Sequence, residues 1–175
     1  MGSSPRPQSP PEVEARLRAH FGDAIVTVGD QFGHAVIEVT VGIYRDVCRF
    51  LRDEPDLAFD YCDFTAGVDW GPERGFEIIT HLFSTTHHHN ARVKITIPHE
   101  DPVAPTVSDL FAGANWHERE TLEMFGIRFE GHPQPVKLLL SEPFEGFPLR
   151  KDFPLMTREA KLWPGAVEGE EEEDE

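Results

Sequence analysis

The segment from Asn115 to Leu155 constrains the fold of this chain more than any other part of the sequence. Its first part, Trp116 to Phe125, has the spacing of an amphipathic helix that ends at Gly126. After the helix, proline and glycine recur every few residues and interrupt regular structure. The same stretch is too apolar for a solvated loop. We therefore expect it to lie against its own domain or against a partner.

The composition describes one globular domain with a strong negative charge. The chain has 175 residues, 39% of them hydrophobic, which is enough to bury a core. Its 32 acidic and 16 basic residues give a formal net charge of −16. A nucleic-acid-binding protein needs a basic patch, and the sequence shows none, so we expect no nucleic-acid partner.

The two ends of the chain have the composition of disordered segments. Residues 1–11 are rich in proline and serine, and residues 157–175 end in an acidic run from Glu168 to Glu175. The N-terminal residues lack the apolar region of a signal peptide, and no run reaches the ~20 apolar residues of a membrane span. Cys48 and Cys62 lack CxxC spacing, so we expect free buried thiols rather than iron–sulfur ligands.

Hydrophobic periodicity predicts the elements of a domain over residues 12–156. Besides the helix at Trp116–Phe125, a repeat of about four residues predicts helices at Glu12–Phe21 and Tyr44–Leu51. Alternating or β-rich runs predict strands at Ala24–Val28, His34–Val41, Leu57–Thr65, Phe76–Ser84 and Arg92–Pro98. The pattern indicates an α+β two-layer domain, with a largely antiparallel sheet and flanking helices, followed by an extended C-terminal segment.

Glu120 is the most informative charge on the predicted helix. It stands between Trp116 and Met124 in one i, i+4 row, so we expect a carboxylate on a buried face. A buried charge needs a partner, and we hypothesise an ion pair with Arg150 that pins the broken segment onto the helix. In the alternative, Glu120 simply reaches water. Arg119 and Glu123 are expected to form a weak surface pair.

Two groups of polar residues allow a catalytic or metal interpretation, and neither favours it. Glu118, Glu120 and Glu123 have no accompanying nucleophile or metal motif, so a structural role is the better interpretation. The three consecutive histidines at 87–89 point in alternating directions in an extended tip. We expect an exposed, pH-sensitive hairpin tip there rather than a zinc site. We predict no catalytic, metal or cofactor-binding residue.

Aromatic residues recur along the segment after the helix. Phe144, Phe147 and Phe153 supply apolar anchors, and Arg150, Lys151 and Asp152 stand between the last two of them. If these side chains face the sheet, the segment is a structural wrap. If they face outward, it is a docking strip. The residues alone leave both open.

The same residues carry a family resemblance. ERETLEMFGIRFEGHP, followed by FEGFPLRKDFPL, resembles the signature of the C subunit of the proton-pumping NADH-quinone oxidoreductase, respiratory complex I. The resemblance covers roughly residues 22–156 and includes Phe59–Trp70, Phe76–Phe83, Arg92–Pro98 and Pro105–Asn115. Departures occur at Leu122-Glu123, where Tyr-Asp is common, at Val136, where Arg is common, and at Phe147, where His is common.

The resemblance implies an α+β fold with a mixed sheet and a position on the cytoplasmic side of the cell membrane, in the peripheral arm of the complex. It implies docking on the D subunit, the large neighbour that shapes the quinone site. Flavin, iron–sulfur clusters, NADH and quinone would belong to other subunits. The acidic tail would stand where many members carry a longer C-terminal extension.

These expectations combine into one hypothesis: a non-redox structural or assembly subunit that supports electron transfer from NADH to quinone. The residues expected to lock or dock the segment are Glu118, Arg119, Glu120, Arg150, Lys151, Asp152, Phe144, Phe147 and Phe153. The nearest alternative is the same module in a relative of complex I, such as a membrane-bound hydrogenase, a deazaflavin-linked dehydrogenase or the photosynthetic ferredoxin-linked complex. A stand-alone metal-dependent hydrolase is a third interpretation.

Overall fold

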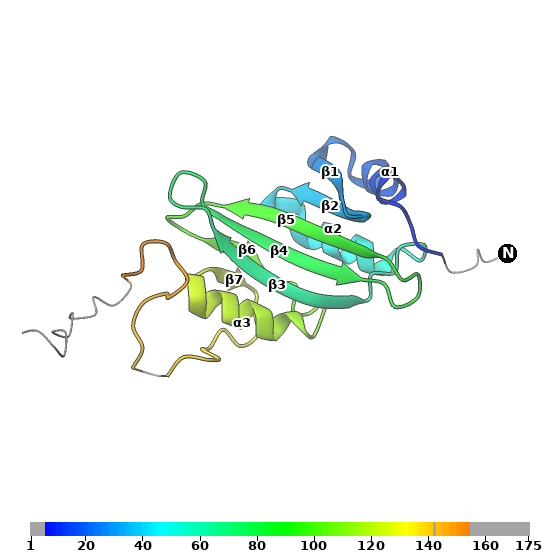
Figure 1. Ribbon diagram of the computed structural model, residues 1–175. Coiled ribbons are helices and arrows are strands. Elements are labelled where there is room, and N and C mark those ends of the chain that lie inside the picture. Colours follow the sequence, from blue (N-terminus) through cyan, green and yellow to red (C-terminus); the bar gives the residue numbers. More distant parts are fainter. Residues whose placement is uncertain (1–5, 142, 155–175) are drawn as a thin grey trace, which may run out of the picture.

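The computed structural model describes residues 6–141 and 143–154 (Figure 1). Its helices are α1 (Pro10–Phe21), the 3-10 turn η1 (Gly22–Ala24), α2 (Val41–Asp53) and α3 (Ala114–Phe125). Its strands are β1 (Ile25–Gln31), β2 (His34–Val39), β3 (Tyr61–Asp69), β4 (Phe76–Phe83), β5 (Asn90–Ile97), β6 (Val103–Pro105) and β7 (Arg128–Glu130). Disorder was predicted for residues 1–11 and for the acidic tail 157–175. Residues 1–5 and the tail lie outside the described residues, whereas Pro10 and Pro11 lie in α1.

The five long strands form one mixed sheet in the order β1-β2-β5-β4-β3. The pairs β1–β2, β5–β4 and β4–β3 are antiparallel, for example with Phe76 of β4 opposite Ile97 of β5. The pair β2–β5 is parallel, with Ala35 opposite Ala91. The predicted α+β class with a mixed, largely antiparallel sheet is confirmed.

The helices cover one face of this sheet. Leu17 of α1, Tyr44 of α2 and Phe125 of α3 join one core cluster with the inward side chains of the strands. In Figure 1, α2 lies behind the sheet and α3 runs along β3. The side chains that alternate with the core positions on β4 and β5, such as Ile79 and Lys94, are only half-buried. The domain therefore has two layers, with the second sheet face uncovered in the described part of the chain.

Local chemistry explains where elements begin and end. Helix α1 starts at Pro10, two residues before the predicted start, because the Ser9 N–H donates to the Glu12 carboxylate at 2.8 Å. The strand predicted from Leu57 begins only at Tyr61, since Ala58 adopts a left-handed φ of 43° and breaks the extended path.

A small second sheet fixes the position of α3. Strands β6 and β7 pair in parallel, with Ala104 opposite Phe129, one on each side of the helix in sequence. Helix α3 ends at Gly126, whose φ of 73° is the left-handed conformation that favours glycine. The helix and the segment that follows it are thereby held next to β3.

Candidate docking surface

Helix α3 turns a different face to the core than the one expected from its sequence. Its buried residues are Ala114, Glu118, Thr121, Glu123 and Phe125. The expected buried row faces outward instead: Trp116 is 61% exposed, Glu120 is exposed, and Met124 is half-buried. The prediction that Glu120 is buried is therefore wrong, and its carboxylate has no hydrogen-bond or ion-pair partner among the described residues.

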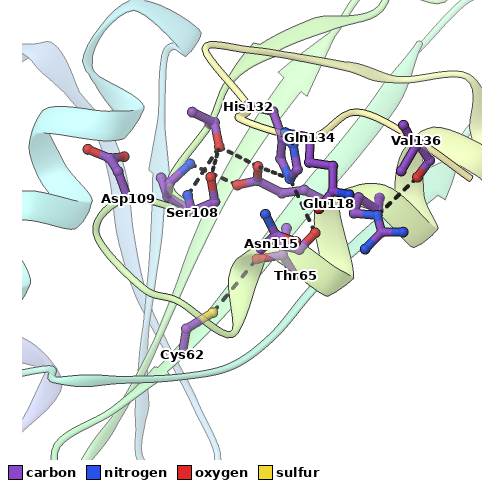
Figure 2. Close-up of polar contacts among 12 residues, drawn as sticks. Cys62, Thr65, Ser108, Asp109, Asn115, Glu118, His132, Gln134 and Val136 are labelled. Atoms are coloured by element: carbon purple, nitrogen blue, oxygen red, sulfur yellow. Dashed lines mark hydrogen bonds and ion pairs between the residues drawn. The ribbon is translucent and has the colours of Figure 1, made fainter. Parts of the chain in front are cut away.

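The buried carboxylate of Glu118 binds the loop that leads into the helix (Figure 2). The Thr106 hydroxyl donates to its Oε2, and the Val107 N–H donates to Oε1 at 2.8 Å. The His132 ring is buried beside it, with Nε2 3.9 Å from Oε2, and donates from Nε2 to the Asn115 carbonyl at 3.2 Å. Burial raises the pKa of Glu118 to about 7, because few donors remain to replace water. Glu118 therefore has a structural role, joining the helix to the loop before it.

Glu123 holds the segment after the helix through that segment's backbone. Its carboxylate accepts three N–H bonds, from Leu138 at 3.0 Å, Leu139 at 2.8 Å and Leu140 at 2.6 Å. Burial by itself raises the pKa of Glu123, but the three donors outweigh it and hold the pKa below its usual value. Glu123 is therefore an ionised anchor of the following segment, whereas its spacing from Arg119 predicted a weak surface pair.

Arg119 binds the same stretch from its other side. Its guanidinium donates to the carbonyls of Val136 at 3.0 Å and Lys137 at 3.1 Å. The predicted Arg119–Glu123 surface pair is wrong, because each side chain bonds to backbone groups of residues 136–140 instead.

Arg150 closes the C-terminal end of α3. Its Nε donates to the Phe125 carbonyl at 2.5 Å, one of the carbonyls that a helix end leaves free. The guanidinium lies over the ring of Phe147, 4.5 Å from its centroid, and 5.2 Å from that of Phe76. The hypothesised Glu120–Arg150 ion pair is not formed in the structure. Arg150 does pin the segment to the helix, but through a carbonyl and two aromatic rings.

The neighbours of Arg150 add further attachments. The Leu149 N–H donates to the Met124 carbonyl at 3.1 Å, and the Lys151 N–H donates to the buried Asp69 carboxylate at 2.8 Å. The Lys151 ammonium lies 6.0 Å from the centroid of the Trp70 ring. Asp152 is exposed.

The three predicted phenylalanine anchors fall into two groups. Phe144 and Phe153 are half-buried and stack on each other, with ring centroids 6.0 Å apart. Phe147 lies under Arg150 and keeps an exposed edge. The segment is thus a wrap held by its own domain, and part of its apolar surface still faces outward.

That outward surface is concentrated in one part of the chain. Nine large apolar side chains are exposed among residues 6–141 and 143–154, and five of them come from α3 and the segment after it. We use the name α3 surface for these five residues together with Glu120: Trp116, Val136, Leu139, Phe147 and Leu149. Their backbone is fixed by the contacts of Arg119, Glu123 and Arg150.

The loop that contains the three histidines 87–89 differs from the exposed hairpin tip that was predicted. His87 and His89 are buried and only His88 is exposed, so the prediction of an exposed tip is wrong for the first two. His89 bonds to the Leu57 carbonyl through Nε2 at 2.7 Å, and its Nδ1 accepts the Gln8 N–H at 2.8 Å. Burial lowers the pKa of His89, in keeping with a neutral ring. His89 thus joins Gln8 to the loop before β5, while Nε2 of His87 donates to the Pro55 carbonyl at 2.9 Å.

Within the described ranges, no group of three or more His, Cys, Asp or Glu side chains is arranged to hold a metal ion. None of the helices described has the length and hydropathy that crossing a bilayer requires.

Comparison with known proteins gives a consistent family. Residues 37–159 match the family described as respiratory-chain NADH dehydrogenase, 30 kDa subunit. The NADH-quinone oxidoreductase C subunit of Roseiflexus castenholzii is 41% identical over 150 residues, which cover 85% of this chain and 86% of the relative. A C subunit of Rhizobium meliloti, designated C 2, is 43% identical over 150 residues, covering 85% of this chain and 82% of the relative.

Solved structures agree with the fold. A trypsin-resistant fragment (1–134) of Nqo5 superposes with a TM-score of 0.59 at 26% identity, covering 70% of this chain and 98% of the fragment. A chain of the archaeal membrane-bound sulfane sulfur reductase, 23% identical over 82% of this chain and 84% of that chain, shares the fold with a TM-score of 0.61. The chain therefore belongs to the family of the 30 kDa subunit of respiratory-chain NADH dehydrogenase, whose bacterial relatives are named as the C subunit of NADH-quinone oxidoreductase.

Proposed function

We propose that this chain is a non-redox structural subunit of an NADH-quinone oxidoreductase. It docks through the α3 surface on the neighbouring subunit that shapes the quinone site, and it supports electron transfer without carrying electrons. Family membership supports the assignment to this enzyme. The observation that carries the docking role is the α3 surface, on which apolar side chains remain exposed although their backbone is fixed.

The rigidity of this surface matters for its energetics. Ordering a loop on binding costs conformational entropy, at about 1–2 kcal/mol per residue for the backbone. Here Arg119 and Glu123 already bind the backbone of residues 136–140 in the free chain, and Arg150 already binds the C-terminal end of α3. A partner that covers Trp116, Leu139 and Leu149 therefore gains apolar burial without that cost.

The remaining parts of the proposal follow from this role. Flavin, iron–sulfur clusters, NADH and quinone are held by other subunits, and this chain contacts the membrane only through the complex. It lies in the peripheral arm, on the cytoplasmic side. Identities near 40% with relatives named as NADH-quinone oxidoreductase C subunits favour this enzyme over the related hydrogenase-type complexes.

The test is affinity purification of the tagged chain from its own cells in mild detergent, followed by identification of the subunits that co-purify. We expect the quinone-site subunit in stoichiometric amount. Leu149→Glu places a charge on the α3 surface and is expected to lower that recovery at least tenfold. Val26→Glu is the matched control, because Val26 is similarly exposed but lies on β1. Wild-type chain that recovers no quinone-site subunit would refute the proposed function.

A further inference from the structure

We propose that the free edge of β3 and the groove beside it accept an extended segment of a partner subunit as an additional strand. This inference rests on the proposed function, since it specifies how a neighbouring subunit is bound next to the α3 surface. It adds backbone pairing to the apolar contact already described. It also defines the sequence character of the segment that binds.

The first observation is that β3 is an edge strand. It is the last strand of the sheet, and its nine residues pair only with β4 among the described elements. One irregularity lies between Cys62 and Phe64, and from Phe64 to Asp69 the register with β4 is regular. An edge strand of this length presents a row of free N–H and C=O groups, which is the template that strand addition uses.

The second observation is a groove along this edge. It has a volume of about 140 Å³ and lies between β3 at residues 65–67 and the outward side of α3. Thr121 and Met124 of the helix and Leu149 of the following segment also line it. The groove therefore provides a place for side chains of an added strand, next to the backbone groups that would pair with it.

Gly67 explains why the groove stays open. A side chain at this position would begin 3.0 Å from the Phe125 ring and 3.1 Å from the Thr121 methyl group. The absence of that side chain lets α3 approach the strand closely, and Gly67 itself remains half-buried rather than buried. Ala66, the residue before it, is also small.

The charge of the residues that line the groove indicates which kind of partner segment binds there. Glu120 lines the groove, is exposed, and has no ion-pair partner among the described residues, whereas Met124 and Leu149 are apolar. We infer an extended segment with alternating apolar side chains and an arginine or lysine opposite Glu120. A second copy of this chain is a poorer occupant, because its net charge of −16 would be brought against an equal charge.

Amide hydrogen exchange measured by mass spectrometry tests the strand directly. Peptides that cover residues 61–69 are compared between the purified full-length chain and the complex recovered by affinity purification. We expect the amides on the outer edge of β3 to exchange at least tenfold more slowly in the complex. Peptides from β5, which is paired on both sides, serve as the internal reference.

A charge reversal tests the chemistry of the occupant. Glu120→Lys is expected to raise the rate at which the quinone-site subunit dissociates at least tenfold. Asp23→Lys makes the same charge change at an exposed position of η1, outside the groove, and is expected to have no effect.

The outcomes separate this inference from the proposed function. If the complex forms but β3 exchange is unchanged, or Glu120→Lys dissociates like Asp23→Lys, the added strand is refuted and the proposed function stands. If the wild-type chain recovers no quinone-site subunit, the proposed function itself fails. Slower β3 exchange in a complex that Glu120→Lys weakens supports both.

Discussion

Arg119 and Glu123 lie one turn apart on α3 and bind opposite ends of the same short backbone stretch. Arg119 donates to the carbonyls of residues 136 and 137, and Glu123 accepts the N–H groups of residues 138–140. Two residues with the spacing of a helical ion pair thus bind the backbone carbonyl and N–H groups of a segment that has no regular secondary structure. This arrangement explains how a segment rich in proline can be ordered.

Replacing Glu123 should destabilise the folded chain. Glu123→Gln removes the charge and one of the two acceptor oxygens that now bind three N–H groups. Bonds to charged groups contribute about 1.5–3 kcal/mol each, so we expect a loss of about 2–4 kcal/mol in the free energy of unfolding in urea. Glu120→Gln is the control and should change that energy by less than about 0.5 kcal/mol. Equal stability of the two variants would contradict the anchoring role.

Gly126 should not tolerate a side chain. Its φ is 73°, and a Cβ there would lie 2.7 Å from the Phe147 ring and from the Arg150 guanidinium. Gly126→Ala is therefore expected to cost about 1–3 kcal/mol and to lower the melting temperature. At Gly113 the nearest atom is 3.6 Å from a new Cβ and φ is −64°, so Gly113→Ala should be nearly neutral. A neutral Gly126→Ala would show that the contact with Arg150 is not tight.

The buried Glu118 should give stability an unusual dependence on pH. Its folded pKa, about 7, lies above the ordinary 4.5, so the folded state holds a proton between these values that the unfolded chain releases. The stabilisation is complete below pH 4.5 and is lost as the pH rises to 7. Compared with Glu118→Gln, the wild type should lose about 2–3 kcal/mol over that range. Urea unfolding at several pH values measures this difference, and parallel profiles would contradict it.

Phe32, at the tip of the β1–β2 hairpin, should be a site where substitution stabilises. It is 89% exposed and adopts a φ of 57°, which costs a bulky residue about 1 kcal/mol. Asparagine tolerates this conformation, so Phe32→Asn should raise the free energy of unfolding by about 0.5–1 kcal/mol. Val26→Asn, at an exposed position of β1 whose φ is not positive, should bring no such gain. A melting temperature lowered by Phe32→Asn would indicate that the ring makes a contact in the folded chain.

Strands with regular alternation could be predicted from sequence, because the alternation itself shows which side chains face the core. Phe76–Phe83 alternates between buried and half-buried residues along its whole length. The parallel pairing of β2 with β5 could not be derived in this way, since alternation does not say which strand lies next to which. Only the family resemblance supplied the mixed sheet.

The site was harder to predict because its buried polar groups have distant partners. Glu118 and Glu123 face inward since Val107 and Leu138–Leu140 supply donors, and no local pattern indicates those donors. The helical spacing of Trp116, Glu120 and Met124 predicted a buried row, although this row faces outward. His87 and His89 were wrongly predicted to be exposed for the same reason. Their ring nitrogens bond to the carbonyls of residues 55 and 57, which are distant in the sequence.

The parallel pair β2–β5 has a consequence for how the chain reaches its structure. Val36 pairs with Arg92, which lies 56 positions later, so this contact closes a long loop. Strands β3, β4 and β5 follow one another as adjacent antiparallel neighbours and have far shorter loops to close. We expect this meander to form early in folding and the hairpin β1–β2 to join it later. During synthesis the β1–β2 hairpin leaves the ribosome before β5. It therefore cannot pair with the rest of the sheet until β5 has also been made.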